Sequence, residues 1–216
     1  MSTTTIAPRR SGLITTPAIT GIAYTLSWIA GLSVGAPSPE VDSGGTAVVS
    51  AFAGHSAAVS AQFLFTEGLP AAGLAVVSLA LARARAAGRQ AGRGGSAGVA
   101  IAGVVAALIS FIQFVLGVTL AGTSSPGTAH LLFDGVNRLD GIKMCTLAAM
   151  AVAAVSTGLL PRWLRFTGVA LAAAIVASGV GYLLLIPSVA TLAYVSGPLL
   201  LLFVTGTGIV LGRRER

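Results

Sequence analysis

Six apolar runs, each about as long as a membrane-crossing helix, limit what this chain can fold into. A bilayer core about 30 Å thick takes about 20 apolar residues in helical form. The runs cover residues 13–35, 58–82, 98–121, 142–160, 166–187 and 190–212. They predict an all-α, polytopic membrane protein: a single membrane domain over residues 1–216, built as a six-transmembrane-helix bundle.

The composition agrees with a membrane environment. Hydrophobic residues make up 55% of the 216 residues and charged residues only 9%, a balance far from that of a soluble domain. The net charge of +7 would raise the question of nucleic-acid binding in a soluble protein. Here the arginines stand in short clusters at the ends of apolar runs, without interleaved aromatic residues, so no nucleic-acid partner is predicted. Cys145 is the only cysteine, which excludes an internal disulfide.

Charged residues sort to two sides if the chain crosses the membrane six times. The arginines that flank the runs then share one side, which the positive-inside rule makes cytoplasmic. The acids Glu40, Asp42, Asp134 and Asp140 fall on the opposite side, and only Glu215 joins the arginines. We therefore predict a multi-pass protein of the cell inner (plasma) membrane with both termini in the cytoplasm (N-in/C-in). The arginines are Arg9, Arg10, Arg83, Arg85, Arg89, Arg93, Arg162, Arg165, Arg213, Arg214 and Arg216.

The connecting segments on the acidic side have recognisable patterns. Residues 36–46 are rich in Pro, Gly and Ser and predict an irregular loop, while residues 48–57 predict a short interfacial helix. Apolar residues recur at helical spacing over 129–143, which predicts an amphipathic extension of the fourth helix into the outer interface. Residues 187–189 form a short hinge, so the last two helices are expected to pack as an antiparallel hairpin.

Glu67 is the residue that this architecture explains least. An ionised group within hydrocarbon costs about 3 kcal/mol on insertion scales, so it needs a partner or a function. Glu67 lies about 13 Å below the outer end of its run at about 1.5 Å per residue, too deep for a short acid to reach the interface. Pro70 cannot donate to the carbonyl of Thr66 and is expected to kink the helix there. A kink, a freed carbonyl and a carboxyl at one depth are typical of a binding site.

Other polar and aromatic side chains reach a similar depth when the helices are aligned by their ends. Together they predict a polar pocket that opens to the outer face and is closed below by small apolar residues. The ligand-binding residues of this pocket are predicted to be Glu67, Gln62, Gln113, Lys143, Tyr24, Tyr182 and Tyr194, with Trp28 in the same layer.

Structural explanations stand beside this pocket hypothesis. Trp28 and Tyr194 fit an aromatic belt that faces lipid. Lys143, placed at a helix end, fits a side chain that extends to the interface. Gln113 fits an interhelical hydrogen bond, and Glu67 fits a buried pair with Lys143 or a hydrogen bond to Gln113.

A second polar group is predicted to form the rim of the pocket. The spacing of Asp134 and Arg138, and of Asp140 and Lys143, equally fits salt bridges on a solvent-exposed helix face. The two histidines lack Cys, Asp or Glu at ligand spacing, so no metal and no cofactor are predicted. No catalytic motif is present either, so no catalytic residue is assigned. The rim residues are His55, His130, Asp134, Asn137, Arg138 and Asp140.

Four segments carry a resemblance that extends over nearly the whole chain. They are "SGLITTPAITGIAYTLSWIAGL", "VVSAFAGHSAAVSAQFLFTEG", "LFDGVNRLDGIKM" and "LPRWLRFTGVALAAAIVASGVGYLLL". Their layout resembles a group of uncharacterised six-helix membrane proteins, a domain of unknown function, from high-GC Gram-positive bacteria. The resemblance implies the fold and no activity.

Three functional hypotheses follow from the sequence. The first is a carrier or sensor that binds a small or lipid-like ligand in the outward-facing pocket. The second is a non-catalytic structural or regulatory membrane subunit, whose polar layer holds the bundle together and whose rim contacts a membrane-protein partner or a second copy. The third is a membrane-embedded enzyme, disfavoured because no catalytic constellation is recognisable.

Overall fold

A computed structural model describes residues 15–87 and 93–214 of the chain, and every regular element in these ranges is a helix. The all-α prediction is therefore confirmed for the described residues. The elements are α1 (Thr16–Ser33), α2 (Gly45–Phe52), α3 (Ser56–Phe63), the π-helical segment η1 (Leu64–Gly68), α4 (Leu69–Ala87), α5 (Arg93–Ala121), α6 (Pro126–Ser156), α7 (Arg162–Leu184), α8 (Pro187–Ala190) and α9 (Ala193–Arg214).

Within residues 15–87 and 93–214, five helical segments are long and apolar enough to cross a membrane. They contain most of the second to sixth predicted runs, so the membrane-protein prediction is confirmed at this coarser level. The first run contains α1, which is not among the five. The five spans are Ser56–Ala87, Ala97–Ala121, Pro126–Ser156, Arg162–Leu184 and Pro187–Arg214.

The outer surface of the bundle is apolar. Leu26 on α1, Ile101 and Leu108 on α5, and Phe166 and Leu184 on α7 are each more than half exposed. A soluble bundle places polar residues on this face, whereas a bundle in lipid needs no hydrophobic contrast between its inside and its outside. The exposed side chains therefore agree with a lipid-facing perimeter.

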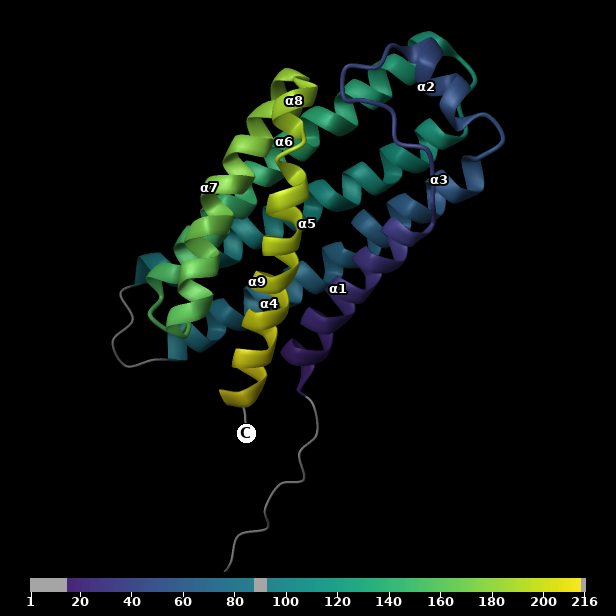
Figure 1. Cartoon of the computed structure of the whole chain (residues 1–216). Helices are drawn as coiled ribbons and strands as arrows, with labels where there is room; N and C mark the ends of the chain where they lie inside the picture. Colours follow the sequence, from purple (N-terminus) through teal and green to yellow (C-terminus); the bar gives the residue numbers. More distant parts are fainter. Residues whose placement is uncertain (1–14, 88–92, 215–216) are drawn as a thin grey trace, which may run out of the picture.

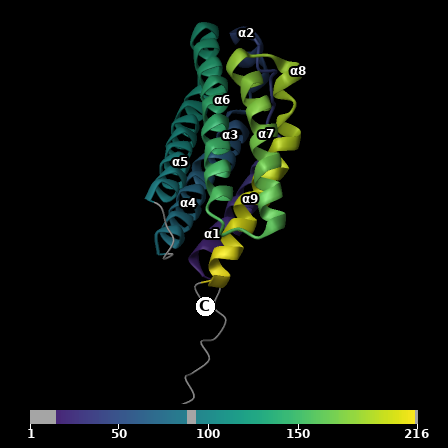
Figure 2. The ribbon, with the colours of Figure 1, turned by 90° about the vertical axis from the view of Figure 1, so that its left-hand side faces the viewer.

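The long helices run side by side and form a closed bundle (Figures 1 and 2). Going around the bundle, α4 packs on α5, α5 on α6, α6 on α7, α7 on α9, α9 on α1, and α1 on α4. The start of α1 and the end of α9 lie at one end, while α2 and α8 lie at the opposite end (Figure 1). The chain thus returns to the end from which α1 starts.

The two ends of the bundle differ in charge. The arginine end carries the described arginines of α4, α7 and α9, which are Arg83, Arg85, Arg162, Arg165, Arg213 and Arg214. Two of them hold the turn after α6, because Arg85 donates to the carbonyl of Thr157 and Arg214 donates to that of Leu159 at 2.5 Å. The acidic end carries Glu40, Asp42 and Asp134. Arg9, Arg10, Arg89, Glu215 and Arg216 lie outside the described residues, as does the side chain of Arg93.

The fourth predicted helix starts and ends earlier than the run 142–160. The helical extension predicted over 129–143 is present, because α6 is one continuous helix from Pro126 to Ser156. Pro126 occupies its first turn, and the side chain of Ser125 accepts a hydrogen bond from the N–H of Thr128, so the start is capped early. Lys143 therefore lies in the middle of a helix and not at its outer end.

Smaller corrections concern the neighbouring segments. The interfacial helix predicted over 48–57 is α2, which begins and ends earlier. The hinge predicted at 187–189 is itself a helical turn, α8. The fifth helix ends at Leu184 because Leu185 adopts a left-handed conformation with φ of 55°.

Two apolar clusters form the interior. The main core includes Leu74, Ala106, Leu147 and Phe203, and a smaller outer cluster includes Val59, Leu120 and Phe133. On α5, Gln113 lies about two helical turns from both Ala106 and Leu120, and on α6 Asp140 lies at the same spacing between Phe133 and Leu147. A polar layer therefore separates the two clusters.

Close helix contacts depend on glycines at particular positions. A Cβ added to Gly141 on α6 would lie 2.5 Å from Cγ of Leu183 and 2.7 Å from the carbonyl oxygen of Gly179, both on α7. A Cβ on Gly135, on the same helix, would meet nothing within 4 Å. Gly141 therefore sets how closely α6 and α7 approach each other.

We expect Gly141→Ala to lower the free energy of unfolding by about 1–3 kcal/mol, because the new methyl group overpacks the α6–α7 contact. Gly135→Ala is the matched control and should raise it by up to about 1 kcal/mol, because alanine favours helix over glycine. Reversible unfolding of the purified protein in detergent measures both. Equal effects of the two substitutions would contradict close packing at Gly141.

Candidate functional site: a buried charge cluster beside a cavity

Glu67 lies in a π-helical turn that interrupts the second long helix. In this turn the N–H of Leu69 donates to the carbonyl of Leu64, five residues back. The same register would pair the next carbonyl, that of Phe65, with residue 70, which is proline and has no N–H. Ser27 of α1 supplies the missing donor, with its hydroxyl 2.6 Å from the carbonyl oxygen of Phe65.

The local irregularity predicted around Pro70 is present, but it is a widened turn that begins at Leu64. The carbonyl of Phe65 binds α1. It is therefore used to dock a helix and is not free for a ligand.

Lys143 and two carboxylates form a buried charge cluster. The Nζ of Lys143 lies 2.8 Å from both Oε1 and Oε2 of Glu67 and 2.6 Å from Oδ1 of Asp140. Lys143 is only 5% exposed and Glu67 only 7%. Both carboxylates bind the ammonium group inside the bundle, so the explanation in which Lys143 extends to the interface is wrong. Of the two structural explanations for Glu67, the buried pair with Lys143 is the one that is present.

The cluster carries an excess of negative charge. Two carboxylates surround one ammonium, so its formal charge is −1. Oδ1 of Asp140 also accepts a hydrogen bond from Nε2 of Gln113 at 3.3 Å, whereas Oδ2 of Asp140 accepts none from any described residue. One acceptor of the cluster thus lacks a partner.

Gln113 links α5 to α6 at the same depth. Its Nε2 donates to the carbonyl of Val136 at 3.0 Å as well as to Asp140. Its Oε1 is buried and has no hydrogen-bond partner within the described residues, although the side chain is only 1% exposed. A buried acceptor without a donor costs about 1–3 kcal/mol, so this position favours a further donor.

A cavity of about 180 Å³ lies against this cluster. It is comparable in size with an engineered cavity of about 150 Å³ that binds benzene. Its wall combines polar groups of the layer, aromatic side chains and the loop before α2. The lining residues are Pro37, Ser38, Pro39, Val41, Phe52, Val59, Gln62, Phe63, Thr66, Glu67, Gln113, Phe133, Val136, Asn137, Asp140 and Tyr182.

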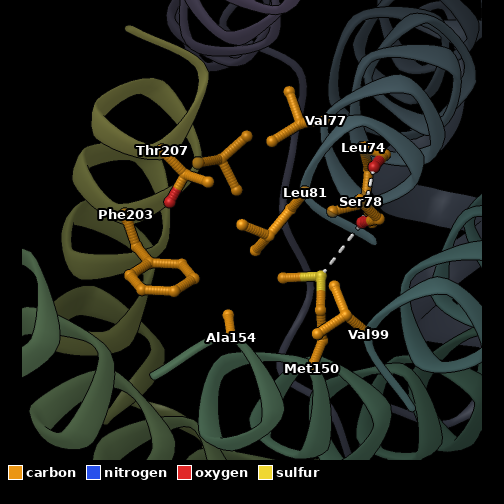
Figure 3. A pocket seen from close by; sticks show the side chains of 10 residues that line it. Leu74, Val77, Ser78, Leu81, Val99, Met150, Ala154, Phe203 and Thr207 are labelled. Carbon is orange, nitrogen blue, oxygen red and sulfur yellow. Dashed lines mark hydrogen bonds between the residues drawn. The ribbon is translucent and has the colours of Figure 1, made fainter. Parts of the chain in front are cut away.

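The bundle is closed between this layer and the arginine end. Leu81, Met150 and Phe203, from three different helices, point toward one another there and leave a void of only about 10 Å³ (Figure 3). A water molecule needs at least about 10–15 Å³. Ser78 is turned inward, donating to the carbonyl of Leu74 at 2.7 Å and contacting the sulfur of Met150 at 3.2 Å.

The structure brings together four of the seven predicted ligand-binding residues at the cavity wall: Glu67, Gln62, Gln113 and Tyr182. Lys143 lies behind this wall and binds the two carboxylates.

Two predicted residues lie apart from the cavity. Tyr24 is buried in the main core, with partly buried Trp28 packed against it, and Tyr194 is 84% exposed at the start of α9. Residue spacing along a helix predicts the depth of a side chain but not the direction in which it points around the helix.

Only some of the predicted rim residues belong to the cavity wall. Asn137 and Asp140 line the cavity, whereas His55, His130, Asp134 and Arg138 do not. Asn137 is itself engaged, donating to the carbonyl of Phe133 at 3.0 Å.

Of the two salt bridges predicted for a solvent-exposed helix face, the structure contains one, and it lies inside the bundle. Arg138 donates to the carbonyl of Leu183 at 3.3 Å instead of pairing with Asp134, whose carboxylate lies 3.6 Å from Nδ1 of His130. Asp140 does pair with Lys143, but inside the bundle. The described residues contain no group of three or more His, Cys, Asp or Glu side chains that could hold a metal ion.

Sequence reasoning missed the apolar part of the wall. Phe52, Phe63 and Phe133 line the cavity, as do Pro37 and Pro39 of the loop. The Pro-rich composition of this loop predicted irregular structure but carried no signal for where the loop would fold back.

Comparisons with known proteins add no relative. No family model, no curated protein and no solved structure matches this chain. The resemblance to six-helix membrane proteins therefore stays a prediction.

We expect Lys143→Met to lower the free energy of unfolding by about 3–5 kcal/mol, because it leaves two buried carboxylates without a cation. Glu67→Gln should lower it by only about 1–3 kcal/mol, because Lys143 keeps Asp140 as its counter-ion. Unfolding in detergent measures both, with Ile142→Met at a neighbouring half-exposed position as control. A larger effect of Glu67→Gln than of Lys143→Met would show that the two acids do not share one ammonium.

Proposed function

We propose that the chain is a multi-pass protein of the cell inner (plasma) membrane that binds a small or lipid-like ligand in a pocket open to the outer face. It acts as a carrier or a sensor. The observation that carries this proposal is the cavity beside Glu67, because an otherwise apolar bundle keeps carboxylates, amides and aromatic rings around one space.

The proposed topology has six crossings with both termini in the cytoplasm. Its support is that α1 lies along α9 and α4 and exposes Leu26 and Leu32 on its outer side. With α1 as the first crossing, the arginine end is the cytoplasmic end by the positive-inside rule. The bilayer is then the first partner of the protein, and the fold fits the group of bacterial six-helix proteins that the sequence resembles.

The position of the cavity favours access from the acidic end. The loop that includes Pro37 and Val41 contributes to its wall, whereas the packed layer around Phe203 separates it from the arginine end. In this state a ligand reaches the pocket from outside. A sensor needs no further opening, and a carrier needs a second state in which the packed layer opens.

A structural or regulatory subunit is the second candidate, favoured by one specific observation. The Lys143 ammonium is paired with both carboxylates within the chain, so the cluster already joins η1 to α6 without a ligand. In that case the acidic end is the surface that a membrane-protein partner or a second copy would contact.

We expect a cysteine at Gln62 to react with a small cationic methanethiosulfonate added from outside, because this side chain lines an open, polar cavity. The background is Cys145→Ala, since the native cysteine is exposed. Ser78→Cys, in the packed layer, is the control and should stay unmodified. Mass spectrometry of the protein in vesicles measures both, and an inert Gln62→Cys would overturn the outward-facing pocket.

The orientation has its own test. In the same Cys145→Ala background, Gly127→Cys at the acidic end should react with an impermeant maleimide on intact cells. Arg165→Cys at the arginine end should react only after permeabilisation. Both positions are exposed, so a difference reports sidedness. The reverse pattern would invert the proposed topology.

A further inference from the structure

We infer that the cavity selects a small organic cation, with a protonated amine or amidine group directed at Asp140. This inference rests on the proposed ligand-binding function and specifies its ligand class. Three features carry it: the uncompensated charge of the cluster, two acceptors of the cavity wall that lack a donor among the described residues, and the aromatic part of that wall.

The charge of the cluster is not balanced from elsewhere. Asp140 and Glu67 line the cavity, and the single ammonium of Lys143 lies between them. The nearest arginine along α6, Arg138, is exposed and donates to the carbonyl of Leu183. The other described arginines of known side-chain position lie at the arginine end. In a space walled by protein, one unbalanced negative charge attracts a cation more strongly than it would in water.

Two acceptors of the wall favour a ligand that donates. Oδ2 of Asp140 accepts no hydrogen bond from a described residue, and Oε1 of the 1% exposed Gln113 is buried without a donor among these residues. Both N–H groups of Gln113 are used within the bundle, on the carbonyl of Val136 and on Asp140. Gln62 and Tyr182 add neutral groups that can donate as well as accept.

Size and aromatic content narrow the ligand further. A volume of about 180 Å³ fits a molecule somewhat larger than benzene, about 6–10 non-hydrogen atoms. Phe52, Phe63, Phe133 and Tyr182 line the same space. Aromatic rings suit both an apolar group and a cation, which their faces attract. A carboxylate or phosphate ligand would instead meet an acid without a free cation.

Three probes of nearly equal size test the charge of the ligand: benzylammonium, benzyl alcohol and benzoate. Binding is measured by calorimetry and by thermal unfolding of the full-length protein in nanodiscs at constant ionic strength. We expect benzylammonium to bind at least about tenfold more tightly than benzyl alcohol, the effect of one charge-assisted hydrogen bond, and benzoate not to bind.

Asp140→Asn assigns the selectivity to one oxygen. Asparagine can still accept from Lys143, but it replaces the free acceptor with a donor and removes the excess charge. The affinity for benzylammonium should fall about 10- to 100-fold while that for benzyl alcohol changes little. Asp42→Asn, an exposed acid outside the cavity wall, is the matched control and should leave both affinities unchanged.

The outcomes separate this inference from the function on which it rests. Equal binding of benzyl alcohol and benzylammonium, or retained selectivity in Asp140→Asn, would overturn cation selection and leave the pocket itself intact. Binding of none of the probes to a protein whose Gln62→Cys variant reacts from outside would also overturn cation selection. An inert Gln62→Cys together with no binding would overturn the pocket itself.

Discussion

The ammonium of Lys143, held between Glu67 and Asp140, is the interaction on which the arrangement of this bundle depends. Within an apolar interior a charge is tolerated only when it is paired and hydrogen-bonded. The pairing requires η1 and α6 to meet at one depth and in one register. Gln113 extends the requirement to α5. Apolar packing alone would let these helices slide more freely, because leucine and alanine faces fit in several registers.

Backbone chemistry places Glu67 at this point. Proline at position 70 cannot complete the π-helical turn, and the carbonyl left over at Phe65 binds Ser27 of α1. The local break that orients the acid therefore also fixes the neighbouring helix. Elsewhere the helices approach through glycines such as Gly141, where any Cβ would meet the backbone of α7.

The polar layer has a different environment on its two sides. Toward the acidic end it borders a cavity walled by aromatic residues and a proline-containing loop, and toward the arginine end it borders a packed core (Figure 3). The same three charged residues thus both stabilise the bundle and shape a space. A structural role for Lys143 and a binding role for Asp140 are compatible, because they use different atoms of the cluster.

The helical class, the membrane-length helices and the need of Glu67 for a partner follow from the sequence alone, since apolar run length and the cost of a buried charge are local properties. The sequence also indicated the pairing with Lys143, but it placed that lysine at a helix end and grouped Asp140 with a solvent-exposed face. Which side chains meet depends on how the helices pack in three dimensions. Tyr24 is buried in the main core and Tyr194 is 84% exposed, so neither belongs to the cavity wall, whereas Phe133 joins it from a segment predicted to be interfacial. The direction of a side chain around its helix depends on the neighbouring helices and does not follow from counting along the chain.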